Sequence, residues 1–272
     1  LSIGIFMARI ILFIIFINGS FGGVLAETQR LRLAVTTSTE NSGLIAKINP
    51  LFEQKHNVKV DIIAVGTGKA IRLAKNGDVD LIFVHAPEAE KEFVAEGYGI
   101  ERLPVMKNDF IIVGPKNDPA RLKDSKNIYD AMSQLIKTQH IFISRGDNSG
   151  THKKENFLWK MIDEKPVGDW YFSVGRGMGQ TIIMADEKQA YTLSDRGTYL
   201  TYRDKIELNI VFEGDHQLIN PYHVVIVAPE KHPHVKIDLA RKYSEFIRSD
   251  EGQNIIRNFK VHGEVLFTPN SY

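Results

Sequence analysis

The sequence of 272 residues predicts an α/β protein made of two lobes. From Leu31 onward, short runs rich in β-branched residues alternate with amphipathic stretches, as in parallel βαβ units covered by helices. Hydrophobic residues make up 43% and charged residues 25% of the chain, so it can bury one large or two smaller cores. No repeat or long flexible linker divides the chain, so we expect it to cross between the lobes more than once.

The first part of the chain predicts strands and helices in alternation. The predicted strands are apolar runs bounded by Gly, Asn or Asp, at 31–35, 58–65, 79–84 and 110–113. The predicted helices show apolar residues at helical spacing, at 44–55, 69–75 and 87–95. Pro50 lies inside the first of these helices and predicts a kink or a late helix start, because proline has no amide hydrogen.

The second part of the chain continues the alternation. Predicted strands cover 140–144, 171–174, 190–194 and 222–228. Predicted helices cover 128–138, 151–163 and 178–188, and two amphipathic helices near the end, 237–249 and 252–259, pack on the existing sheet. We place the crossings between lobes near 110–113 and 222–225. Residues 27–112 plus 225–272 are thus predicted to form lobe I, and 113–224 lobe II.

The N-terminal segment predicts a secretory signal peptide over residues 1–26. Met7, the expected initiator, and Arg9 precede an uncharged aliphatic and aromatic run at 10–17, which is too short to span a bilayer. The residues at 24–26 suit cleavage ahead of Glu27. We therefore expect an exported protein, most simply in a periplasm, and the absence of cysteine predicts that it has no lipid anchor.

Composition and charge exclude several function classes. The formal net charge is +1, and removal of Arg9 with the leader leaves the mature chain neutral, so no basic field indicates nucleic acid. The chain has no cysteine, which excludes disulfides, thiolate metal sites and cysteine nucleophiles. The sequence has no His-Glu-x-x-His spacing and no Gly-x-Ser-x-Gly elbow. We expect neither a catalytic site nor a cofactor nor a resident metal.

The run Thr36–Thr39 follows an apolar strand at the point where a helix begins. The start of a helix offers unpaired N–H groups and a partial positive charge, and the two together favour anions. A helix cap needs one hydroxyl, whereas here the hydroxyls are consecutive and are followed by Asn41 and Ser42. The run therefore favours an anion site over capping alone.

Two glycine-containing segments have the same character but fit no nucleotide motif. Residues 65–70 lack the earlier glycine and the following Ser/Thr of a phosphate loop, yet Thr67 offers a hydroxyl at another helix start. In residues 175–181, Gln180 stands where the dinucleotide fingerprint needs glycine, while Gly179 allows close backbone approach to a ligand. Arg176 in this segment is either a second cation or a solvated side chain.

The segment Arg145–Thr151 carries the strongest signal. It follows a predicted strand, and Arg145 offers a planar fork suited to oxyanions. Ser149 and Thr151 lie where the next helix begins, while Asp147 suits holding the guanidinium in place. Two hydroxyl-rich helix starts about a hundred residues apart predict an oxyanion held between two lobes, at the carboxyl ends of the strands.

These residues resemble a known family. The segment 34–44, Ala-Val-Thr-Thr-Ser-Thr-Glu-Asn-Ser-Gly-Leu, resembles the opening signature of tungstate-binding proteins of ABC uptake systems. The segments 65–70, 144–152 and 191–196 match it too, and so does Asn220-Pro221-Tyr222. The resemblance covers nearly the whole mature chain, and the Arg-…-Ser-Gly-Thr segment is more distantly similar to periplasmic phosphate-binding proteins.

The resemblance implies a bilobal periplasmic-binding-protein fold, in which two βαβ lobes are joined by cross-over strands and close on the ligand in the cleft. It also implies a monomer that delivers the oxyanion to a membrane permease with its cytoplasmic ATPase. Carried over by position, the oxyanion contacts are Thr37, Ser38, Thr67, Arg145, Ser149 and Thr151, with Gly179 from the loop 177–181. Val35 departs from the signature, which often begins with three threonines, so a hydroxyl is absent there.

The charge of the oxyanion and whether it carries a proton determine which ligands the site can favour. A tetrahedral dianion carries −2, which Arg145 and two helix starts of roughly +0.5 each can offset. Phosphate retains a proton at neutral pH and wants an acceptor, whereas tungstate, molybdate and sulfate do not. Whether Asp147 or Glu40 faces the ligand is left open by the sequence. The alternatives are a molybdate- or phosphate-binding protein of the same fold, or a phosphoryl-processing enzyme.

Overall fold

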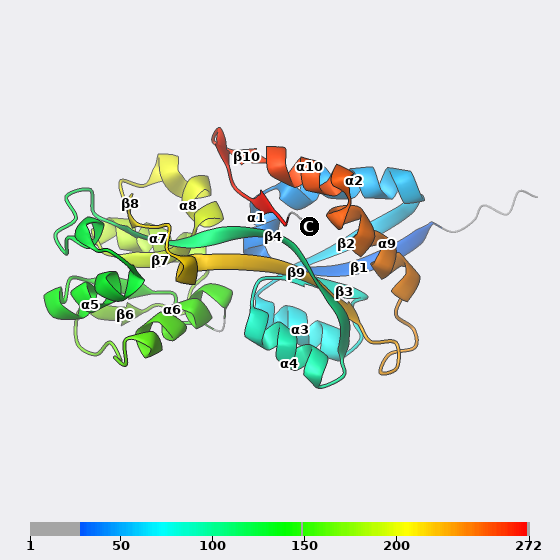
Figure 1. Ribbon diagram of the computed structural model, residues 1–272, viewed down its shortest axis with the longest axis horizontal. Coiled ribbons are helices and arrows are strands. Elements are labelled where there is room, and N and C mark those ends of the chain that lie inside the picture. The colour runs from blue at the N-terminus through cyan, green and yellow to red at the C-terminus, as the bar shows by residue number, and fades with distance from the viewer. Residues whose placement is uncertain (1–27, 148, 271–272) are drawn as a thin grey trace, which may run out of the picture.

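The computed structural model describes residues 28–147 and 149–270 of the protein. The predicted signal peptide, with Met7 and Arg9, lies outside these residues. The described chain forms two lobes, joined by the long strands β4 (Gly99–Gly114) and β9 (Ile219–Val227), as Figure 1 shows. Among the described residues, no helix is long and apolar enough to cross a membrane.

The first lobe is built on parallel strands β1 (Gln29–Thr36), β2 (Val58–Val65) and β3 (Leu81–Val84), with β1 between the other two. Strand β9 then pairs antiparallel with β3, and β4 pairs antiparallel with β9. The helices of this lobe are α1 (Thr37–Asn41), α2 (Leu44–His56), α3 (Thr67–Lys75), α4 (Pro87–Ala95), α9 (Ile237–Arg248) and α10 (Asp250–Asn258).

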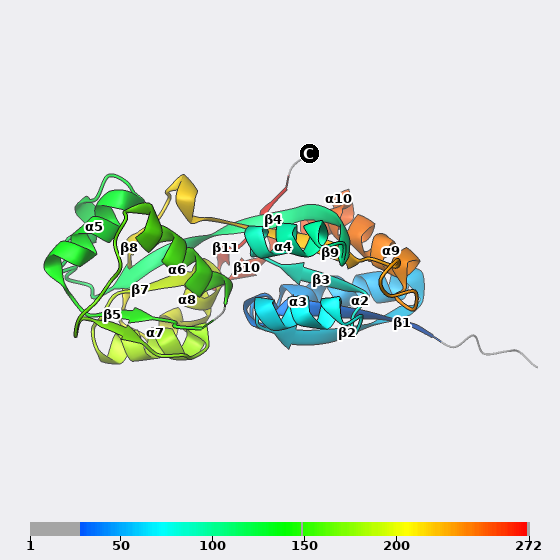
Figure 2. The same cartoon turned by 90° about the horizontal axis from the view of Figure 1, so that it is seen from below.

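The second lobe contains the other end of β4. There β4 pairs antiparallel with β7 (Thr192–Asp195) and β8 (Asn209–Phe212), while β5 (Phe142–Ser144) pairs parallel with β6 (Tyr171–Ser173). Its helices are α5 (Ile128–Thr138), α6 (Gly150–Met161), α7 (Met178–Glu187) and α8 (Arg196–Tyr202), with 3-10 turns at Leu122–Asp124, Arg203–Lys205 and His216–Leu218. Figure 2 shows this lobe beside the first, with β4 and β9 running between them.

Strand β4 shows how one strand serves two cores. Ile111 and Val113 pack in one hydrophobic cluster, whereas Phe110 and Ile112 pack in another, because side chains alternate between the two faces of a strand. The strand pairs with β9 up to Asp109 and with β7 from the next residue onward. It therefore connects the lobes through continuous backbone pairing.

Most predicted elements are confirmed, and the differences have physical reasons. The sheets are mixed rather than all parallel, because β4 and β9 run antiparallel to their neighbours. Strand β4 is far longer than the predicted 110–113, since its first half carries polar residues that hide the strand pattern. Helix α2 continues through Pro50 without ending there. The lobe boundaries at 112/113 and 224/225 stay predictions.

Several elements were not predicted from the sequence. They are helices α1 and α8, strand β8, and the short C-terminal strands β10 (Lys260–Val261), β11 (Glu264–Val265) and β12 (Thr268–Pro269). The C-terminal strands are two residues each, too short to give an alternating pattern. Strand β12 nevertheless extends the large sheet by pairing with β4, and it ties the C-terminal segment to the strand that joins the lobes.

Candidate oxyanion-binding site

A cavity of about 310 Å³ brings together residues from both lobes. Helix α1 contributes its first turn, α7 contributes its N-terminus, α8 contributes one face, and Arg145 reaches in from the loop after β5. The lining residues are Thr37, Ser38, Asn41, Arg145, Gly177, Met178, Gly179, Gln180, Gly197, Thr198, Thr201 and Tyr202. Of the predicted contacts, Thr37, Ser38, Arg145 and Gly179 therefore line one cavity.

The four consecutive hydroxyls of the first motif divide into two roles. Thr36 is the N-cap of α1, and its Oγ1 accepts a hydrogen bond from the Thr39 amide at 3.3 Å. The hydroxyls of Thr36 and Thr39 lie 2.6 Å apart and both residues are buried. Thr37 is exposed and Ser38 half-buried, and these two line the cavity. The residue that caps α1 is thus a different member of the run from the two that line the cavity.

Arg145 is held in place by the loop that carries it. Its side chain is 10% exposed, and Nε donates to Asp147 Oδ2 at 2.9 Å. The other carboxylate oxygen of Asp147 accepts from the Ser149 amide at 3.0 Å. Gly146 between them has φ +65°, and a Cβ there would lie 2.0 Å from Ser173 Oγ, so glycine is needed at this turn. Asp147 therefore holds the guanidinium, as its position suggested.

The remaining predicted contacts lie outside the lining of the cavity. Ser149 is the N-cap of α6: its Oγ accepts from the His152 amide at 3.2 Å, which leaves its own O–H free to donate. Thr67 and Thr151 lie in the first turns of α3 and α6 and are each 2% exposed. Neither lines the cavity. Arg176 is exposed and does not line it.

The question of which acidic residue faces the ligand is narrowed by the structure. None of the described residues that line the cavity is Asp or Glu. Asp147 is engaged by Arg145 and the Ser149 amide. Glu40 does not line the cavity. Its carboxylate lies near Tyr243 of α9: burial raises the pKa of the Tyr243 hydroxyl most, and the negative charge of Glu40 raises it further. The cavity thus presents hydroxyls, amides and a guanidinium.

His85 connects the cavity to β9, a role that sequence reasoning missed. It follows β3 and is 5% exposed, with Nε2 3.3 Å from Ser38 Oγ and Nδ1 2.9 Å from Asn220 Oδ1. Its ring stacks on Tyr222 with centroids 4.6 Å apart. A Cβ on Gly150 would lie 3.1 Å from its Cε1, so the start of α6 packs against it. The available signal was its position at the carboxyl end of a strand beside β1.

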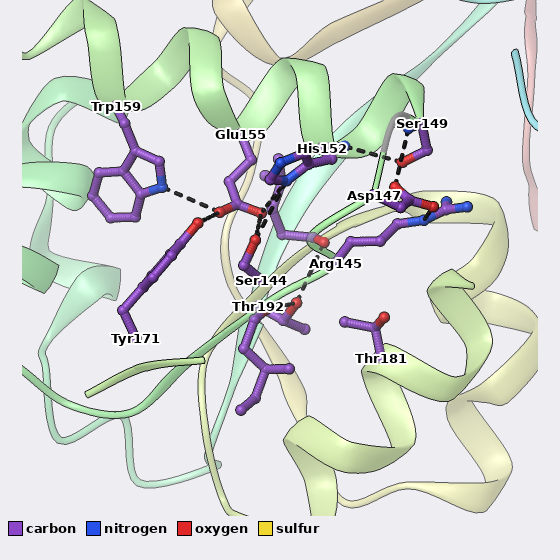
Figure 3. A network of polar contacts seen from close by, with 12 residues as sticks. Ser144, Arg145, Asp147, Ser149, His152, Glu155, Trp159, Tyr171, Thr181 and Thr192 are labelled. Atoms are coloured by element: carbon purple, nitrogen blue, oxygen red, sulfur yellow. Dashed lines mark hydrogen bonds and ion pairs between the residues drawn. The ribbon is translucent and has the colours of Figure 1, made fainter. Parts of the chain in front are cut away.

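A buried carboxylate supports the Arg145 loop from behind. Glu155 on α6 is 1% exposed and accepts hydrogen bonds from Ser144 Oγ at 2.9 Å, Trp159 Nε1 at 3.2 Å and the Tyr171 hydroxyl at 2.5 Å. Burial and the Glu155 charge raise the pKa of Tyr171 above its ordinary value. Figure 3 shows this network along α6, with Arg145 and Asp147 in the loop beside it. Ser144 directly precedes Arg145, so the network fixes the start of that loop.

A second cavity of about 380 Å³ lies against His85, and its lining is more apolar than that of the cavity beside Arg145. It is lined mostly by apolar groups, among them Phe110, Phe157 and Ile219, with Lys153 and Lys154 at its edge. Lys154 donates to the Gln217 carbonyl at 2.9 Å and lies over the ring of Phe157. An apolar lining does not suit a doubly charged ion, so the cavity beside Arg145 is the candidate oxyanion site.

The described residues contain no group of three or more His, Asp or Glu side chains arranged to hold a metal ion. The described residues that line the cavity offer hydrogen-bond donors and one cation, Arg145. Hydroxyls of Thr37 and Ser38, the amides at the start of α7 and the guanidinium of Arg145 converge on one space. Such a set suits an oxyanion that accepts hydrogen bonds at each oxygen.

Comparison with known proteins adds to this geometry. The profile of the PBP superfamily domain matches residues 24–251. The tungstate-binding protein TupA of Peptoclostridium acidaminophilum is 45% identical over 243 residues, which cover 88% of this chain and 85% of that protein.

Two solved structures are similar as well. The tungstate ABC transporter structure from Geobacter sulfurreducens has 52% identity and a TM-score of 0.77, over 83% of this chain and 97% of that chain. The tungstate-binding protein TupA from Desulfovibrio alaskensis G20 has 43% identity and a TM-score of 0.82, over 90% of this chain and 100% of that chain. The likeness thus extends over both lobes.

Proposed function

The chain belongs to the PBP superfamily and, within it, to the tungstate-binding proteins, and from this premise we propose that it captures tungstate for an ABC transporter. It is a binding protein and not an enzyme. The observation that carries the proposal is the convergence of Arg145, the first turn of α1 and the N-terminus of α7 on one cavity. These groups come from both lobes, as a ligand between lobes requires.

The donors fit a tetrahedral dianion. Arg145 supplies a full positive charge, and the N-terminus of α7 contributes a partial charge of roughly +0.5. No atom lies within 4 Å of a Cβ placed on Gly177, so an oxygen of the ligand can approach the backbone N–H groups there. Gly179 also lines the cavity, and the Tyr202 hydroxyl occupies the place that a Cβ on Gly179 would need. We propose Thr37, Ser38, Arg145 and Gly179 as direct contacts.

We propose three further residues, Ser149, Thr151 and Thr67, as contacts. Ser149 and Thr151 flank Gly150, which packs against His85 next to Ser38, so both lie near the cavity. Ser149 also keeps its hydroxyl hydrogen free. Thr67 starts α3 at the carboxyl end of β2, on the same edge of the sheet as Thr37. It stays a prediction that rests on the family resemblance.

The selectivity follows from the proton on the ligand. Phosphate at neutral pH carries an O–H that needs an acceptor, and no described residue lining the cavity is a carboxylate. We therefore propose that phosphate binds more weakly than tungstate. Molybdate has the same charge and shape as tungstate, and molybdate binding by the same site is the alternative specificity.

A thermal-shift titration tests this function. Tungstate at a hundredfold excess over its dissociation constant is expected to stabilise the protein by about 2.7 kcal/mol, which raises the melting temperature by roughly 5–10 °C. Phosphate at the same concentration is expected to raise it less, because its O–H finds no carboxylate among the described residues that line the cavity. If phosphate raises the melting temperature and tungstate does not, the proposal is wrong. Turnover of a phosphoester that is lost in Ser149→Ala would instead indicate the enzyme.

The wider role is proposed on the same basis. We propose that the mature protein acts as a monomer in the periplasm, after export by the predicted leader, and delivers the anion to a membrane permease with its cytoplasmic ATPase. The near-neutral charge of the mature chain offers no attraction to nucleic acid. The two-lobed fold, joined by β4 and β9, supports closure on the ligand.

A further inference from the structure

We propose that His85, which lies behind the oxyanion cavity, takes up a proton when the anion binds and thereby turns the Ser38 hydroxyl toward the ligand. This inference rests on the proposed function and adds a positioning residue to it. His85 does not line the oxyanion cavity; it contacts Ser38, which does. It would couple the affinity for the anion to pH.

In the amide orientations that the structure shows, the hydrogen bonds of Asn220 indicate the tautomer of His85. The Asn220 Nδ2 group donates to Asn108 Oδ1 at 2.7 Å and to the Tyr222 hydroxyl at 3.3 Å. The Asn220 Oδ1 atom is therefore the one that faces His85, and it can only accept. Nδ1 of His85 must then carry a proton. In a neutral imidazole this leaves Nε2 as an acceptor.

The Ser38 hydroxyl has one proton, and its neighbours are Thr36 Oγ1 at 3.2 Å, His85 Nε2 at 3.3 Å and the cavity. The Thr36 hydroxyl can donate to Ser38 Oγ, whereas Nε2 of a neutral His85 can only accept, so the Ser38 O–H donates to Nε2 while His85 is neutral. That proton is then not available to an anion. When His85 is protonated, its Nε2–H donates to Ser38 Oγ, and the Ser38 O–H is free to donate into the cavity. Anion binding through Ser38 and protonation of His85 therefore favour each other.

Burial, rather than the charges around it, favours the neutral form of His85 before an anion is bound. Burial is the main cause that lowers the pKa of His85, and the positive charge of Arg145 acts in the same direction, while Asp195 of β7 and Glu90 of α4 act against it. The Tyr222 ring of β9 stacks on the His85 ring. His85 also lines the second cavity, together with the charged residues Glu88 of α4 and Lys153 and Lys154 of α6.

A bound dianion changes this balance. Among the described residues that line the oxyanion cavity, Arg145 is the one full positive charge, and the remaining charge of a −2 ligand is offset by the partial charges of helix N-termini. An imidazolium at His85 would supply a second positive charge nearby and add the Ser38 hydrogen bond. The pKa of His85 therefore rises on binding, and affinity increases as pH falls through the interval between the free and bound pKa values.

Isothermal titration calorimetry with sodium tungstate measures this linkage. At pH 6.5, titrations in buffers of different ionisation enthalpy are expected to reveal proton uptake on binding. The dissociation constant of the wild-type protein is expected to fall by about threefold to tenfold between pH 8.0 and pH 6.0. In His85→Gln, an uncharged amide can donate to Ser38 at every pH, so we expect tungstate binding without proton uptake or this pH dependence. The exposed His216 offers the matched control, and His216→Gln should keep both.

The outcomes separate this inference from the proposed function. Tungstate binding with no pH dependence and no proton uptake overturns the role of His85 while the function stands, whereas no binding at any pH overturns both. Proton uptake that persists in His85→Gln but vanishes in His152→Gln also overturns the role of His85. That result assigns the proton to the His152–Glu155 pair. If His85→Gln fails to fold, nitrogen NMR of the wild-type His85 ring decides: a pKa that rises with tungstate supports the proposal, and an unchanged pKa contradicts it.

Discussion

Replacing Arg145 with alanine is expected to weaken tungstate binding by roughly tenfold to a hundredfold or more. Arg145 is the cation among the residues that line the oxyanion cavity, and its side chain is mostly shielded from water. A hydrogen bond to a charged group contributes about 1.5–3 kcal/mol, and each 1.4 kcal/mol changes the dissociation constant about tenfold. Calorimetric titration with tungstate measures the change directly.

Arg121→Ala is the matched control. Arg121 also lies in the second lobe and also pairs with an aspartate, Asp124, but its side chain is 76% exposed and it does not line the cavity. Its loss is expected to leave the dissociation constant unchanged. Equal affinities in wild type and Arg145→Ala, with both proteins folded, would remove Arg145 from the site.

Gly146→Ala is expected to lower both stability and affinity. Gly146 has φ +65°, where an alanine costs about 1–2 kcal/mol. The added Cβ would also lie 2.0 Å from Ser173 Oγ and 3.1 Å from the Val174 amide nitrogen, which donates to Ser144. We expect the free energy of unfolding to fall by about 2–4 kcal/mol, since overpacking adds to the backbone strain. Because Arg145 precedes this turn, tungstate binding should weaken by roughly tenfold.

Gly175→Ala separates the two causes. Gly175 has a similar φ of +62°, but no atom lies within 4 Å of a Cβ placed there. Its substitution should therefore cost the backbone strain alone, about 1–2 kcal/mol. Denaturant unfolding of the two variants measures the difference. If both lose the same stability, the contact with Ser173 and Val174 does not matter.

Most helices and strands were predictable because the spacing of apolar residues along the sequence differs between helices and strands. The strand 58–65 and the helices 87–95 and 128–138 agree with β2, α4 and α5 residue for residue. Strand β4 was the exception: its half that joins the lobes carries Glu101, Lys107 and Asp109, which break an apolar run. The direction of strands in space was also beyond the sequence, because antiparallel pairing with β9 depends on tertiary contacts.

The site was predictable where polar residues gather in one short segment. Thr37, Ser38 and Arg145, which line the cavity, could be singled out because hydroxyls and a guanidinium follow apolar strands, and their contact with the ligand stays a prediction. Thr67 and Thr151 share that pattern, yet the direction of a side chain in the first turn of a helix cannot be read from neighbours in sequence. His85 was missed because a single histidine after a strand is more often a packed core residue, and its partner Asn220 lies 135 positions away.

Anomalous X-ray scattering from tungsten, in a crystal of the protein grown with tungstate, would locate the ligand without any assumption about the fold. We expect one strong peak inside the cavity, within hydrogen-bond distance of Ser38 and Arg145 and of the backbone at Gly179. A peak in the apolar cavity beside Phe157, or on the outer surface of either lobe, would contradict the claim that segments of both lobes enclose one oxyanion.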